Sequence, residues 1–125
     1  MEPKLVMETA AGLFAVAALG GLVMAGIRFS GPNPPIWLAM LHGFLAAAAL
    51  TLLIYAACTV GLPSLANLAI VLFIIAALGG VVLNLNYQWK LVPLPKWLVL
   101  VHALVAVVGF VLLLLALWAP QGVST

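Results

Sequence analysis

Four long apolar runs limit what this chain can fold into. They cover about residues 9–29, 36–60, 65–89 and 96–118, and turn-forming glycine or proline separates each from the next. At 1.5 Å per residue, a helix of about 20 residues crosses the roughly 30 Å of bilayer hydrocarbon. Lipid offers the backbone no hydrogen-bond partner, so runs of this length form helices. The sequence therefore predicts an all-α transmembrane bundle of four up-down helices, in a single domain over residues 1–125.

The composition also indicates that lipid, and not water, surrounds most of the protein surface. Hydrophobic residues make up 68% of the chain and charged residues only 5%, whereas soluble domains are about half apolar and a quarter charged. The net charge of +2 is thinly spread, which argues against nucleic acid binding. The single cysteine, Cys58, excludes an internal disulfide. Glu2 and Glu8 stand where a signal peptide is cationic, so we expect the first run to remain as a spanning helix.

The chain is a tandem duplication of a helical hairpin. Leu13–Met24 matches Leu72–Leu83 at eight of twelve positions, fifty-nine residues apart. Pro34–Leu50 returns as Leu94–Phe110 sixty residues later. Each hairpin crosses the membrane twice, so the copies run in the same direction and a pseudo-two-fold axis along the membrane normal relates them. The second and fourth helices are then parallel, with matched residues at the same depth.

The two histidines, His42 and His102, occupy matched positions in the duplicated helix. Each follows a tryptophan by five residues, Trp37 in one copy and Trp97 in the other. Each also lies roughly 10 Å along its helix from the proline that precedes it, which is within the hydrocarbon. A histidine there is costly and by default functional. Diagonal helices of a bundle, roughly 12–14 Å apart, leave a gap between two inward imidazoles that suits one metal.

The ligand chemistry of two histidines favours haem over a bare metal ion. Zinc and copper need three or four ligands, and no carboxylate or cysteine lies near either histidine in the sequence. Haem iron needs only two protein ligands, because the porphyrin supplies four nitrogens. We therefore predict that His42 and His102 are the axial ligands of one haem b. With both axial positions filled, we expect electron transfer rather than catalysis.

Further residues are expected to surround the porphyrin. Small residues let a flat macrocycle approach the backbone, although they also pack membrane helices without any cofactor. Basic residues would neutralise the propionates, although topology alone also places them at one membrane face. The predicted contacts are Gly20, Gly21, Gly79, Gly80, Ala46 and Ala106 for packing, and Arg28, Lys90 and Lys96 for the propionates. Asn84 and Asn86 are too close to share a helix face. We expect both to mark the end of the third helix; the alternative is that one of them faces the bundle and bonds a propionate or a carbonyl.

The basic residues also predict an orientation. Arg28, Lys90 and Lys96 lie on the side of the two long links, whereas Lys4 on the opposite side is offset by two glutamates. The short link and the polar tail at residues 119–125 carry no charge. By the positive-inside rule, the long links face the cytoplasm and both termini face out, in what we expect to be a bacterial inner membrane.

A four-helix membrane bundle with inward histidines on paired helices resembles the small membrane b-type cytochromes, broadly the cytochrome b561-like proteins. The resemblance covers the architecture of the whole chain and rests on His42 and His102 as motif residues. It implies electron transfer, with a quinone or a larger redox complex as partner. Members of that group often hold two haems through two histidine pairs, whereas this chain has one pair. With little polar mass outside the helices, the chain is also expected to act as a homo-oligomer or within a larger complex.

Two other functions stay open from the residues alone. A cofactor-free structural or accessory subunit would use its histidines for hydrogen bonds between helices, worth about 0.6–2 kcal/mol each. A small transporter, acting as a dimer, is the less favoured alternative, because such proteins usually carry an ionisable residue along the pathway. The helices here contain no carboxylate beyond Glu8 at the edge, so proton coupling would fall to the histidines.

Overall fold

The chain folds into a bundle of long helices, and the computed structural model describes residues 1–118. The elements are α1 (Pro3–Ser30), α2 (Ile36–Thr59), α3 (Ser64–Leu83), the π-helical segment η1 (Asn84–Gln88) that continues α3, and α4 (Lys96–Trp118). α1, α2, α4 and the combined α3–η1 helix are each long and apolar enough to cross a membrane. The predicted all-α four-helix fold is confirmed, and the protein is an integral membrane protein. The predicted polar tail lies outside the described residues.

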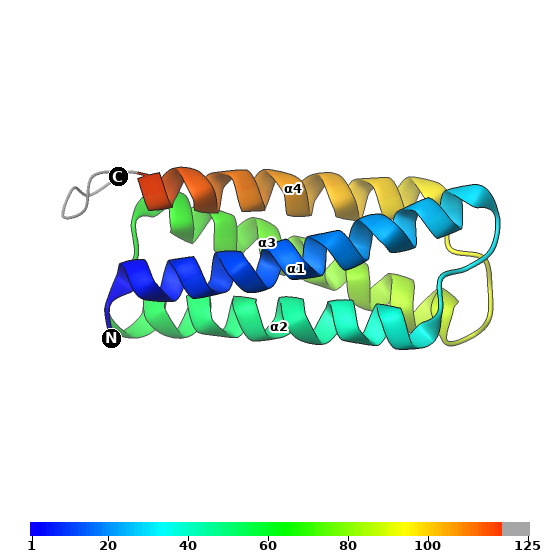
Figure 1. Cartoon of the computed structure of the whole chain (residues 1–125), viewed down its shortest axis with the longest axis horizontal. Coiled ribbons are helices and arrows are strands. Elements are labelled where there is room, and N and C mark those ends of the chain that lie inside the picture. The colour runs from blue at the N-terminus through cyan, green and yellow to red at the C-terminus, as the bar shows by residue number, and fades with distance from the viewer. Residues whose placement is uncertain (119–125) are drawn as a thin grey trace.

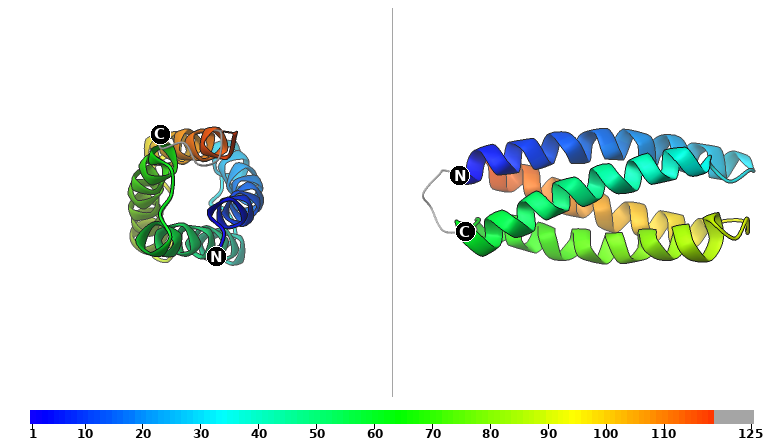
Figure 2. Two further views of the ribbon diagram at one scale, coloured as in Figure 1. Left: turned by 90° about the vertical axis from the view of Figure 1, so that its left-hand side faces the viewer. Right: turned by 90° about the horizontal axis from the view of Figure 1, so that it is seen from below.

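The helices run up and down at the corners of a square (Figure 2). The α1–α2 and α3–α4 links share one end of the bundle, here called the link end. The N-terminus and the short α2–α3 turn share the other, the terminal end (Figure 1). Packing is most extensive within each hairpin, while α1 also packs on α4 and α2 on α3. Helices α2 and α4 are therefore parallel and diagonal to each other, as the duplication predicts.

The first helix begins at Pro3, so the predicted start near Thr9 was wrong. Proline is well tolerated in the first turn of a helix, where its missing N–H would have no partner in any case. Lys4 and Glu8 lie one turn apart and form an ion pair at 3.8 Å, which adds modest support to the polar first turns. Hydropathy marks only the apolar part of a spanning helix, and it therefore misses this extension.

The third helix also departs from the prediction, which carried a regular helix to Trp89. It is α-helical only to Leu83, and in the wider turn that follows the Trp89 N–H donates to the carbonyl of Asn84 at 2.9 Å. The matched part of α1 remains α-helical. This difference changes which side chains point inward. Gln88 is only 4% exposed, whereas Phe29, the residue that the duplication matches to it, is 43% exposed.

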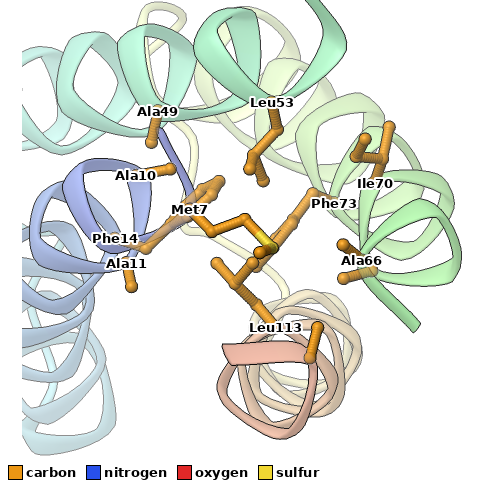
Figure 3. Close-up of a cluster of buried hydrophobic side chains, with 12 residues drawn as sticks. Met7, Ala10, Ala11, Phe14, Ala49, Leu53, Ala66, Ile70, Phe73 and Leu113 are labelled. Atoms are coloured by element: carbon orange, nitrogen blue, oxygen red, sulfur yellow. The ribbon is translucent and has the colours of Figure 1, made fainter. Parts of the chain in front are cut away.

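The best-packed part of the interior lies toward the terminal end (Figure 3). Phe14 and Phe73, which the duplication matches, stack with ring centroids 3.9 Å apart and 12° between their planes. The fully buried side chains of Met7, Leu53 and Leu113 belong to the same cluster. We call these five residues the phenylalanine layer. Its apolar side chains close the centre of the bundle on the terminal side.

Removing one ring of this layer should weaken the association of the helices. Membrane helices that separate remain in lipid, so Phe73→Ala loses packing contacts but little water-to-lipid transfer energy. We expect a loss of about 2 kcal/mol in the free energy of unfolding, below the roughly 3–5 kcal/mol typical of soluble cores. Titration with a denaturing detergent measures this loss. The control is Leu78→Ala at a 63% exposed position, and equal losses in the two variants would contradict the packing role.

Candidate cofactor site

His42 on α2 and His102 on α4 meet inside the bundle, next to the phenylalanine layer. Their ring centroids are 6.1 Å apart, and the ring planes are inclined at 74°. Two imidazole nitrogens that are each about 2 Å from one shared metal place the ring centroids roughly 6 Å apart. The structure thus brings the two predicted ligands together from diagonal helices, at a spacing that suits a single metal.

Each imidazole is held by a backbone carbonyl of its own hairpin. The Nδ1 atom of His42 lies 2.7 Å from the carbonyl oxygen of Ala17, and the Nδ1 atom of His102 lies 2.7 Å from that of Ala76. Because a carbonyl only accepts hydrogen bonds, each Nδ1 carries the proton and each Nε2 carries the lone pair. Metal-binding histidines are commonly oriented by such a bond from the second ring nitrogen. Both Nε2 atoms are therefore suited to bind a metal.

Two glycines make this arrangement possible. A Cβ added at Gly21 would lie 3.0 Å from Cε1 of His42, and one added at Gly80 would lie 3.2 Å from Cε1 of His102. Both separations are closer than ordinary van der Waals contact, so any side chain at these positions would press on the ring. Gly21 and Gly80 are thus the places on α1 and α3 where the imidazoles pack against the backbone. The two predicted contact residues therefore position the histidines.

The other small residues predicted at the site have looser surroundings. A Cβ at Gly20 would meet no atom within 4 Å, and one at Gly79 would be in ordinary contact with His102 at 3.8 Å. Ala46 and Ala106 are both half-buried, and Ala46 packs against the terminal-end core. Contact of these four residues with a cofactor stays a prediction.

The three basic residues lie at the link end, and the structure gives two of them other contacts. Arg28 donates from Nε to the carbonyl of Leu94 and from Nη1 to a carbonyl in the α1–α2 link, both at 2.8 Å. Arg28 therefore joins the two long links to each other. The Lys96 ammonium lies 5.7 Å from the centroid of the Phe29 ring, and Lys90 is exposed. Their predicted contact with propionates stays a prediction.

Two amide side chains with buried oxygens also lie at this end, the half-buried Asn84 and the buried Gln88, and the sequence reasoning missed Gln88. The Asn84 side chain donates from Nδ2 to the sulfur of Met40 at 3.7 Å, and Gln88 donates from Nε2 to the carbonyl of Pro34. The side-chain oxygens of both amides are buried without a hydrogen-bond partner. Leaving a buried acceptor unpaired costs about 1–3 kcal/mol, so these oxygens mark a place for a donor group. The available sequence signal was a pair of amides four residues apart near the end of a largely apolar helix.

This set of donors fits a metal that brings most of its own ligands. Within residues 1–118, no group of three or more His, Cys, Asp or Glu side chains is placed to hold a metal ion. Two imidazoles, by contrast, complete the coordination of iron in a macrocycle that supplies four nitrogens. His42 and His102 therefore fit haem in number, tautomer and spacing.

The fold and the site define the class of this protein as a four-helix integral membrane protein with one inward-facing histidine pair. Comparisons with protein-family models, with curated proteins and with solved structures found no match. We therefore derive the function from the geometry of the histidine pair.

Proposed function

We propose that this protein is a membrane b-type cytochrome that holds one haem b between α2 and α4, with His42 and His102 as the axial ligands. One observation carries the proposal. Both Nδ1 atoms are bonded to backbone carbonyls, which leaves two Nε2 lone pairs on rings whose centroids are 6.1 Å apart. When bound, the haem supplies one-electron redox chemistry at its iron.

The surrounding residues orient the ligands and exclude water. The carbonyls of Ala17 and Ala76 fix the tautomer of the imidazoles and raise their basicity as ligands. The phenylalanine layer keeps the terminal side of the site dry. With His42 and His102 both bound to the iron, no coordination position would remain for a substrate, so the proposal is an electron carrier or a redox subunit, not an enzyme.

A groove beside the site supports a partner that approaches through the lipid. It lies between α1 and α2, and its apolar lining includes His42, Trp37, Leu41 and Leu45. We propose that electrons pass here to or from a membrane quinone, or a larger redox complex or second copy of the chain that covers the same face. We propose a location in a bacterial inner membrane, and the basic residues at the link end support an orientation with the links in the cytoplasm and the termini outside.

An absorption spectrum tests the proposed cofactor. Purified protein is titrated with haem, and spectra are recorded before and after addition of dithionite. We expect saturation at one haem per chain, with a low-spin spectrum in both oxidation states because two imidazoles bind the iron. Circular dichroism confirms that the helices are intact during the titration. A folded protein that binds no haem, or binds it only in a high-spin state, would contradict the proposal.

A cofactor-free accessory subunit is the second candidate, and one observation favours it. Each histidine already makes a hydrogen bond between the two helices of its hairpin. Glutamine at position 42 or 102 keeps an N–H donor for the carbonyl of Ala17 or Ala76. Under this alternative, His42→Gln and His102→Gln are therefore tolerated and the protein remains folded. Under the cytochrome proposal, the same variants stay folded and lose the low-spin spectrum.

A further inference from the structure

We infer that Asn84 and Gln88 form a subsite for the carboxyl edge of the bound porphyrin, so that this edge points to the link end along α3. The inference rests on the proposed haem function and adds the orientation of the group within the site. The proposed carboxyl contacts are two neutral amides. Arg28, which the sequence analysis predicted as a propionate contact, is already bonded to two backbone carbonyls.

The amides lie on η1, which continues directly from the part of α3 that contacts the histidine. Gly80 lies against the His102 ring, and Asn84 and Gln88 follow at intervals of four residues. At 1.5 Å per residue, Asn84 lies about 6 Å farther along the helix than Gly80. The carboxyl arms of haem b extend from one edge of the macrocycle. A porphyrin centred on the histidines therefore presents these arms about one to two helical turns away.

The opposite direction is closed to a polar group. On the terminal side of the histidines stand Phe14 and Phe73, stacked with centroids 3.9 Å apart, together with the fully buried Leu53 and Leu113. A carboxyl placed among these side chains would lose its hydrogen bonds to water and gain none. The link side, by contrast, offers two buried oxygens that have no partner.

The chemistry of the amides selects the form of the carboxyl. The Nε2 atom of Gln88 is used by the Pro34 carbonyl, so its Oε1 atom can only accept a hydrogen bond. The Asn84 Oδ1 atom is likewise a free acceptor while Nδ2 faces the sulfur of Met40. Both oxygens therefore need a donor. A protonated carboxylic acid provides the O–H, and an ester of the same acid does not.

Haem b and its dimethyl ester provide a matched pair of probes, because they share the iron and the ring and differ in the O–H donors. Affinities are measured by absorbance titration for the unchanged protein, Asn84→Leu and Gln88→Leu. We expect the unchanged protein to prefer the free acid by about ten-fold, in line with hydrogen bonds to buried acceptors. In either leucine variant the ratio should fall toward one. A steric loss from leucine affects both probes and cancels in the ratio.

Asn86→Leu is the matched control, because Asn86 is exposed and only two residues from either amide. It should keep the full preference for the free acid. If leucine at position 84 or 88 prevents folding, Asn84→Ala and Gln88→Ala provide the same ratio with smaller side chains. An unchanged ratio with intact low-spin spectra would overturn the subsite and leave the cytochrome proposal standing. Failure of both probes to give a low-spin spectrum would instead overturn the cytochrome proposal.

Discussion

His42→Ala and His102→Ala should each abolish low-spin haem binding, although each variant removes only one of the two ligands. Iron with a single axial imidazole has an open position and becomes high-spin. Altering a group that merely orients a metal ligand weakens metal binding by about 10–100-fold, so losing a ligand should weaken haem binding by at least about 100-fold. The duplication gives the two rings the same orienting bond, each to the carbonyl of a matched alanine. We therefore expect losses of similar size.

Haem titrations followed by absorbance measure both variants. Added imidazole should restore the low-spin spectrum in either variant, because it fits the space left by the missing ring. Thr51→Ala on the exposed face of α2 is a control, since Thr51 bonds only to a carbonyl of its own helix. Retention of a low-spin spectrum in both alanine variants without added imidazole would exclude these histidines as the ligand pair.

Leucine at Gly21 or at Gly80 should displace the neighbouring imidazole. The first atom of the new side chain would already lie 3.0 Å from the ring of His42 or 3.2 Å from that of His102, and leucine adds three more carbons. The ring must rotate, which breaks its bond to the alanine carbonyl and moves Nε2 from its present position. We expect a loss of about 1–3 kcal/mol in the free energy of unfolding without haem, and a loss of at least about ten-fold in haem affinity.

Gly26→Leu is the matched control for Gly21→Leu. Both positions lie in α1, but Gly26 is exposed and is not a predicted cofactor contact, and a Cβ there would meet nothing within 4 Å. Leucine favours helix more than glycine does, so this control should leave the free energy of unfolding unchanged or slightly higher. Detergent titration and haem titration give the two measurements. Equal effects at positions 21 and 26 would show that Gly21 has no special relation to the imidazole.

Much of the fold could be predicted from the sequence because lipid leaves few choices. A run of some twenty apolar residues must be helical in a bilayer, and the two copies of the hairpin must then lie in the same direction. Those two constraints place His42 and His102 at one depth on diagonal helices. The bonds to Ala17 and Ala76 could not be predicted, because they depend on ring rotation and on local helix approach. For the same reason, the sequence could not show that Gly21, and not Gly20, packs against the imidazole.

The inward-facing residues at the polar ends of the helices could not be predicted from the sequence, for a related reason. A helix that is apolar all round shows no stripe that would indicate its inward face. The π-helical turn after Leu83 adds a change of phase that no periodicity in the sequence marks. Gln88 is therefore buried where a regular helix resembling α1 would leave it exposed, as Phe29 is.

Joining both hairpins in one polypeptide allows the two halves of the site to differ. Two identical hairpins related by a two-fold axis must place the same residue at both matched positions. Here Asn84 and Gln88 are matched by Ala25 and Phe29 in the first hairpin, and the wide turn is found in the second. A strictly symmetric pocket would accept a flat, asymmetric ring equally well after a half-turn, giving two mixed isomers. In the proposed cytochrome, the two amides line only one side of the site, so the two isomers would differ in energy.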